Sequence, residues 1–173
     1  MIHESNEVAK VEIEDVDLTF DKIYKKQYFP TDLMDEISKA NALIIPYDEG
    51  FRERKEPLFP ELTSEFFYYV KEAAKGTDAK IDICVSDEQF YELEMHADVV
   101  NIPMILLEYA VLPIVTGLIS GYILEKIKVK RRNDPKIKVD LVVQLNGKSK
   151  KISYEGDADK FEETIKAINL LEE

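Results

Sequence analysis

The stretch NIPMILLEYAVLPIVTGLISGYILEKIKVKRR, residues 101–132, decides how this chain folds. Between Tyr109 and Leu124 it carries no charged side chain, and it then becomes strongly basic. A segment this apolar is stable only where water is excluded: inside a bilayer, inside a protein core, or against another chain. The class of protein depends on which of the three surrounds it.

A membrane attachment through residues 102–124 is one alternative. A spanning helix needs about 20 predominantly apolar residues, whereas the uncharged run has only the 16 residues from 109 to 124. Extension back to Ile102 would bury Glu108 in hydrocarbon, at a cost of about 3 kcal/mol near the bilayer centre. The basic residues would mark the cytoplasmic side and leave residues 1–100 outside, yet the N-terminal residues show no export signal. We therefore favour burial in protein.

A helix that is apolar on all sides has to be buried on all sides. We expect a central helix, kinked at Pro113, whose uncovered remainder lies in a subunit interface. Gly117 and Gly121 form a G-x-x-x-G spacing, which allows another helix to approach closely. The residues expected in the interface are Tyr109, Leu112, Gly117, Gly121, Lys128, Lys130, Arg131 and Arg132.

The first hundred residues alternate between strand and helix patterns. Residues 8–20, 42–47 and 79–85 are typical of strands, and ALIIPY at 42–47 has the continuous apolar run of a strand covered on both faces. Residues 31–40, 62–76 and 86–100 are typical of helices, the last starting with a capping box from Ser86 to Gln89. Such alternation predicts a parallel sheet with helical crossovers.

The last forty residues predict a hairpin and a helix. Asn146-Gly147 is a strong two-residue hairpin signal. A turn there pairs Leu141 with Ile152 and Val139 with Tyr154, which puts all four apolar side chains on one face. Residues 157–173 have the apolar spacing of an amphipathic helix.

These patterns together predict an α/β fold. We expect a mixed, largely parallel sheet flanked by helices, with a central apolar helix and a C-terminal β-hairpin plus helix. Residues 1–173 would form a single domain with three parts: an alternating β/α part (1–100), the apolar helix with its basic flank (101–132), and the hairpin and helix (136–173).

Charge and cysteine content limit the compartment and the partners. The chain has a net charge of −12; residues 1–100 hold 24 acidic and 11 basic side chains, and residues 125–151 hold 10 basic and 3 acidic ones. Nucleic acid is therefore not an expected partner, because most of this surface repels a polyanion. The single Cys84 excludes an intrachain disulfide and suits a reducing compartment. We expect a cytoplasmic protein.

Polar residues follow two of the predicted strands. Asp48 and Arg52 come after the strand at 42–47, and Ser86 and Asp87 come after the strand at 79–85. Ligands bind at the carboxyl ends of strands in open parallel sheets, so these four residues are the candidate ligand site. Turn and helix-end preferences explain the same residues without a ligand, and we favour that explanation. Familiar catalytic and metal-binding motifs are missing, so we expect no catalytic residue, cofactor or metal.

Three functions remain. The favoured one is a non-catalytic accessory subunit that oligomerises, or docks on another protein, in a cytoplasmic, prokaryotic multiprotein complex. The second is a small-ligand or nucleotide-binding sensor or enzyme that uses the strand ends. The third is a membrane-attached protein.

Overall fold

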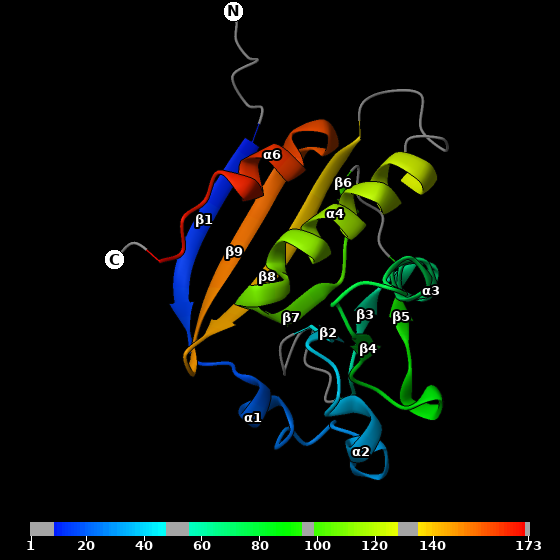
Figure 1. The fold of residues 1–173 in the computed structure, drawn as a ribbon. Helices are drawn as coiled ribbons and strands as arrows, with labels where there is room; N and C mark the ends of the chain where they lie inside the picture. The colour runs from blue at the N-terminus through cyan, green and yellow to red at the C-terminus, as the bar shows by residue number, and fades with distance from the viewer. Residues whose placement is uncertain (1–8, 48–55, 95–98, 128–134, 172–173) are drawn as a thin grey trace, which may run out of the picture.

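A computed structural model describes residues 9–47, 56–94, 99–127 and 135–171. Its centre is a seven-stranded sheet (Figure 1). The strand order is β1 (Ala9–Val16), β9 (Lys148–Asp157), β8 (Lys136–Leu145), β7 (Met104–Glu108), β2 (Ala42–Ile45) and β4 (Ile81–Ile83), and β6 (Val99–Asn101) also pairs with β8. A second, two-stranded sheet joins β3 (Phe59–Pro60) to β5 (Glu92–Leu93).

The predicted mixed α/β class is confirmed, but the balance of the sheet differs. The pairings β2–β4, β6–β8 and β7–β8 are parallel, and β1–β9, β8–β9 and β2–β7 are antiparallel. The sheet is evenly mixed and not largely parallel. The difference arises in the connection from β4 to β7. A strand that returned parallel to β2 would need a long crossover before it, usually a helix. The chain instead enters β7 antiparallel to β2.

The C-terminal hairpin is confirmed with its register. Leu141 pairs with Ile152 and Val139 with Tyr154 across β8 and β9. Asn146 and Gly147 have φ angles of 54° and 77°, the left-handed region that a two-residue hairpin turn requires. The four paired side chains are all buried in the main core.

Three helices cover one face of the sheet. The central one, α4 (Leu112–Tyr122), begins after the turn η5 (Tyr109–Val111) and continues into the π-helical turn η6 (Ile123–Ile127). It packs against α3 (Thr63–Ala73) and against α6 (Phe161–Lys166), which follows η7 (Ala158–Lys160). Within the described residues, no helix has both the length and the apolar character needed to cross a membrane.

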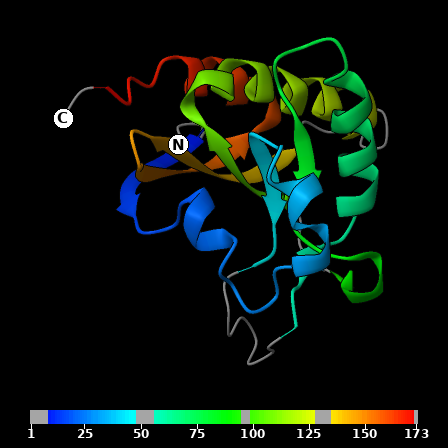
Figure 2. The ribbon, with the colours of Figure 1, turned by 60° about the horizontal axis from the view of Figure 1, so that its bottom comes forward.

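A smaller core fills the opposite face. There α1 (Phe20–Ile23), η2 (Thr31–Leu33) and α2 (Met34–Ile37) pack on the part of the sheet around β2 and β7 (Figure 2). The buried residues of this second core come from several segments: Phe20, Ile23, Phe29, Ile37, Leu43, Ile45, Cys84, Leu106 and Val142. Strand β2 is thus buried on both sides, as its sequence predicted.

The long apolar segment is not one continuous helix. Residues 104–108 form β7, whose neighbours are β2 and β8. Leu106 faces the second core, while Ile105 and Leu107 face the main core. A strand that is buried on both faces is apolar throughout, so its composition is the same as that of a buried helix. Pro113 also does not kink the helix: it lies in the first turn of α4, where its missing N–H costs nothing.

The helix predicted at 86–100 is wrong for its described residues, 86–94 and 99–100, and residues 95–98 lie outside the described chain. Residues 87–89 form a single turn, η4 (Asp87–Gln89), and the chain then becomes extended at Phe90 and enters β5. The expected capping box is not formed, because the Ser86 side chain caps no backbone N–H. The β-branched residues Val99 and Val100 instead belong to β6, where they pair with Lys136 and Ile137 of β8. Tertiary pairing here overrides a local helix signal.

Candidate functional site

The edge strand β1 is the most unusual surface of the described molecule. It lies at one end of the strand order, paired only with β9 among the described residues (Figure 1). Two of its apolar side chains reach solvent: Val11 is 36% exposed and Ile13 is 46% exposed. All eight residues pair with β9 in one unbroken register, so the strand has no bulge, and it contains no proline.

The pairing with β9 assigns a face to each β1 side chain. Val11 lies opposite Tyr154 and Ile13 opposite Ile152, on the face that the helices cover. Lys10, Glu12 and Glu14 point to the other face. There Lys10 lies opposite Glu155 and Glu14 opposite Lys151, two cross-strand pairs of opposite charge. Such pairs each stabilise a sheet by roughly 0.2–1 kcal/mol. From Ala9 to Glu14 one face of β1 is thus apolar and the other charged, whereas Asp15 lies on the first face and Val16 on the second.

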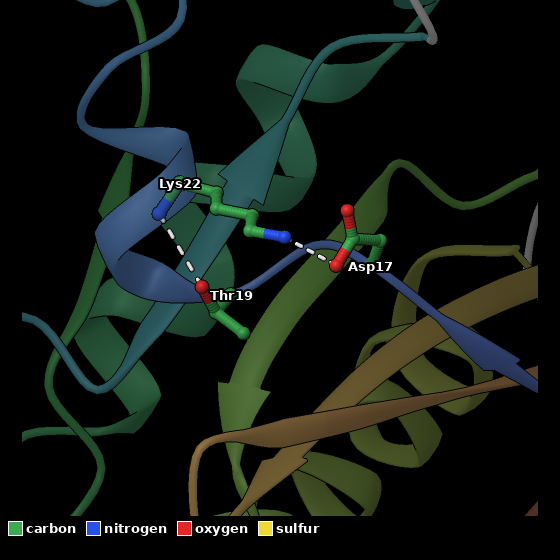
Figure 3. Close-up of polar contacts among 3 residues, drawn as sticks. All are labelled: Asp17, Thr19 and Lys22. Atoms are coloured by element: carbon green, nitrogen blue, oxygen red, sulfur yellow. Dashed lines mark hydrogen bonds and ion pairs between the residues drawn. The ribbon is translucent and has the colours of Figure 1, made fainter.

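The end of β1 is held in place by polar contacts. The Asp15 carboxylate lies 3.2 Å from the Lys150 ammonium across the β1–β9 pair. Beyond the strand, Lys22 forms an ion pair with Asp17, and its backbone N–H donates to Thr19 Oγ1 at 3.3 Å, which caps α1 (Figure 3). The Phe20 N–H donates to Gln144 Oε1 at 2.8 Å. These contacts connect the C-terminal end of β1 and the residues after it to β8, β9 and α1.

A cavity of about 490 Å³ opens near the carboxyl end of β4. It is lined by aromatic, acidic and amide side chains and one proline: Gln27, Tyr28, Glu56, Pro57, Glu88, Gln89, Phe90 and Tyr91. The Phe90 ring packs on Phe59 with centroids 5.3 Å apart, which fixes one wall. Two of the described lining side chains, Glu56 and Glu88, are carboxylates, and none of the described ones is basic.

The residues predicted to bind a ligand lie beside this cavity or outside the described chain. Strands β2 and β4 are adjacent and parallel, which is the arrangement that the ligand hypothesis needs. Ser86 is half-buried and Asp87 is exposed, and both precede the lining residue Glu88 without lining the cavity themselves. Asp48 and Arg52 lie outside the described residues. Among the described residues, no group of three or more His, Cys, Asp or Glu side chains is placed to hold a metal ion.

The residues predicted for a subunit interface spread over α4 and its flanks. Leu112 is buried and Tyr109 is half-buried. A Cβ atom at Gly121 would lie 2.9 Å from the Tyr69 hydroxyl, and one at Gly117 would lie 3.9 Å from Glu162 Oε2. Gly121 therefore makes room for Tyr69 of α3 in the same chain, whereas the contact of Gly117 with α6 is an ordinary van der Waals contact. The basic residues Lys128, Lys130, Arg131 and Arg132 lie outside the described residues.

One polar group that the sequence did not reveal supports the start of α3. Glu92 of β5 accepts hydrogen bonds from the backbone N–H groups of Leu62 at 2.8 Å and Ser64 at 2.9 Å. A carboxylate at a helix N-terminus satisfies free donors and complements the helix dipole. The residue that caps this helix is thus 28 positions or more away in sequence, and no local motif could have identified it.

The contact between α3 and α4 contains a buried tyrosine. The Tyr122 hydroxyl donates to Glu65 Oε1 at 2.9 Å, and its ring makes edge contacts with Phe66 and Tyr69 at centroid distances of 5.1 and 5.6 Å. Burial, the hydrogen bond and the nearby Glu65 charge raise the pKa of Tyr122 well above its usual value of 10.0. This tyrosine therefore remains protonated and acts as a hydrogen-bond donor that ties the two helices together.

Comparisons with protein-family models, with curated proteins and with solved structures find no match to this chain. Function is therefore argued from the surfaces described above.

Proposed function

We propose that this chain is a non-catalytic accessory subunit that associates with a second copy of itself, as part of a cytoplasmic multiprotein complex. The observation that carries the proposal is the edge strand β1. Its length of eight residues exceeds the usual strand, and within the described part of the chain one side of its backbone faces no other strand. Soluble proteins usually protect such an edge by shortening it, bulging it, placing a proline in it or lining it with charged side chains. Of these devices β1 has only the last, in Lys10, Glu12, Glu14 and Asp15.

The side chains of β1 also suit pairing with another strand. Val11 and Ile13 provide apolar area that an added strand would cover. The charges on the opposite face have both signs, so they can select a partner strand and do not simply repel every strand. Added strands of this kind are a common mode of protein recognition, in which the backbone supplies affinity and the side chains supply specificity.

Light scattering coupled to size-exclusion chromatography tests the proposal. The mass should rise from the monomer value of 20.0 kDa towards twice that value as the protein concentration increases. Replacement of Ile13 by lysine should shift the protein to monomer with little change in melting temperature, because Ile13 is half exposed in the single chain. Tyr68→Lys on α3, where the side chain is 71% exposed, is the matched control and should leave the mass unchanged. A wild-type chain that stays monomeric at its highest soluble concentration contradicts the proposal.

The cavity beside β4 supports a second candidate function, the binding of an organic cation. The Phe90 ring can contact a flat or apolar body, and the Glu88 carboxylate can neutralise a positive charge. Aromatic faces and carboxylates together are typical of cation recognition. The overall charge of −12 favours the approach of a cation.

Benzamidine and its neutral analogue benzamide test the cavity. Benzamidine should bind, as measured by calorimetry, and benzamide should bind at least about tenfold more weakly, because a charge-assisted contact contributes roughly 1.5–3 kcal/mol. Glu88→Gln should weaken benzamidine binding and leave benzamide unaffected. Equal binding of the two compounds, or binding of neither at millimolar concentration, contradicts this second function.

A further inference from the structure

We propose that two copies pair their β1 strands antiparallel about Glu12, so that Lys10 of each copy lies opposite Glu14 of the other. This inference rests on the proposed self-association through β1 and concerns the register of the contact. It follows from the faces that the β1–β9 pairing assigns to the side chains.

Symmetry restricts the registers that are available. Two identical edge strands that run antiparallel in one continuous sheet are related by a two-fold axis perpendicular to that sheet. The helix layers of both copies then lie on the same side. Directly opposed residues share a face of a sheet, so Val11 and Ile13 oppose apolar residues only in registers centred on a residue of the strand.

Three centred registers can be compared by the pairs they create. Pairing about Glu12 aligns residues 9–15, placing Val11 opposite Ile13 twice, Lys10 opposite Glu14 twice, and Glu12 opposite its own copy once. Pairing about Ile13 aligns residues 10–16 and opposes Glu12 to Glu14 twice. Pairing about Val11 also opposes Lys10 to Glu12 twice, but it aligns only residues 9–13 of the described strand. The first register combines the longer overlap with two attractive charge pairs, and like charges directly opposed are destabilising.

The geometry also explains why such an assembly stops at two copies. The same strand on both subunits forms the contact, so each copy has used its long edge once the dimer forms. Among the described residues the sheet also ends at β4 and at β6, which have three residues each. A strand this short is a poor template for further pairing. A closed dimer is therefore expected, and not a fibre.

Charge exchange at Lys10 and Glu14 tests the register. K10E alone should place two carboxylates against each other at both symmetric contacts, and E14K alone should place two ammonium groups there. Each homodimer should weaken by about tenfold or more, since several cross-strand pairs change sign. Mixed together, the two variants should form a heterodimer at least as tight as the wild-type dimer. In that heterodimer one contact joins the two substituted side chains and the other joins the two native ones, so both contacts again oppose charges of opposite sign. Sedimentation velocity with one variant fluorescently labelled measures the affinity of the heterodimer.

A control separates contacts between copies from contacts within one chain. Lys10 lies opposite Glu155 of its own β9, so K10E also removes an internal pair. E155K removes the same internal pair without changing β1, and it should leave the dimer affinity within about twofold of the wild type, since exposed pairs contribute little. Melting temperatures of the variants verify that they remain folded.

Glu12→Gln distinguishes the registers independently. It removes the single like-charge contact on the two-fold axis, so dimerisation should tighten by about two- to fivefold. Pairing about Val11 would instead put Glu12 opposite Lys10, and the same change would weaken the dimer. A wild-type chain that remains monomeric overturns the proposed self-association as a whole. A wild-type dimer that is indifferent to K10E and E14K, or that weakens with E12Q, overturns only the register.

Discussion

Replacement of Leu106 by alanine should lower the free energy of unfolding by about 2–5 kcal/mol. Leu106 is fully buried in β7, at the centre of the sheet, and its side chain lies in the second core with Phe20, Leu43 and Ile45. Removal of its three terminal carbons leaves a cavity that neighbours from β2 and α1 cannot fill without moving. Urea denaturation followed by circular dichroism gives the free energy directly.

Leu124 provides the matched control for Leu106. It belongs to the same apolar segment of the sequence, but its side chain is 54% exposed in η6. Leu124→Ala should change the free energy of unfolding by less than about 0.5 kcal/mol, the usual range for surface substitutions. A loss below about 1 kcal/mol for Leu106→Ala would contradict the placement of residues 104–108 as a strand buried on both faces, because buried leucines cost more than this to truncate.

The thiol of Cys84 should react with a disulfide reagent at least about a thousandfold more slowly in the folded protein than in the unfolded chain. Burial, together with the nearby Asp82 charge, raises the pKa of Cys84 from 9.0 to about 12. The thiolate is the reactive form, so its fraction at about pH 8 falls by about three powers of ten. The side chain also has no exposed surface, which blocks the reagent.

The pH dependence follows from the direction of that shift. In the folded protein the thiolate fraction should keep rising tenfold per pH unit to about pH 12, while the unfolded chain levels off near its ordinary pKa. Stopped-flow measurement at about pH 8 with and without denaturing urea compares the two states, and the Cys84→Ala protein provides the blank. Comparable rates in both states would show that Cys84 is accessible, contrary to its place in the second core.

The parts of the fold that the sequence predicted are those with short-range signals. Asn146-Gly147 specified both the turn and the register of β8 on β9, because a two-residue loop leaves no freedom in the pairing. The continuous apolar run at 42–45 likewise indicated a strand buried on both faces, and β2 is one. In each case the evidence lay within a few residues of the element that it predicted.

The parts that could not be predicted depend on partners far away in the sequence. Residues 104–108 have the composition of the helix that follows them, and only their position between β2 and β8 makes them a strand. Glu92 lies in the segment predicted to be a helix at 86–100, but its carboxylate accepts hydrogen bonds at the N-terminus of α3. Ser86 and Asp87, which were predicted to bind a ligand, lie next to a cavity whose lining, from Glu88 to Tyr91 and from two other segments, carried no motif.

The candidate interface on β1 also could not be predicted from local sequence patterns. Its strand character was clear from residues 8–20, but whether a strand lies inside or at the margin of a sheet is a property of topology. From the sequence, the expected interface lay on the apolar helix, around Gly117 and Gly121. In the structure α3 and α6 lie against those glycines, and two of the exposed apolar side chains, Val11 and Ile13, are on β1.

The pairing of β1 with β9 also determines when this protein can finish folding. Val16 pairs with Ser149 and Ala9 with Gly156, so β1 waits for a partner strand that is synthesised more than about 130 residues later. At ribosomal rates of about 5–20 residues per second, that delay is on the order of 10 s. During this time the nascent β1 has both edges open and its apolar face uncovered, a state that invites mispairing. Contacts of such long sequence separation slow folding, and we expect the docking of β1 onto the finished hairpin to be the last step in completing the sheet.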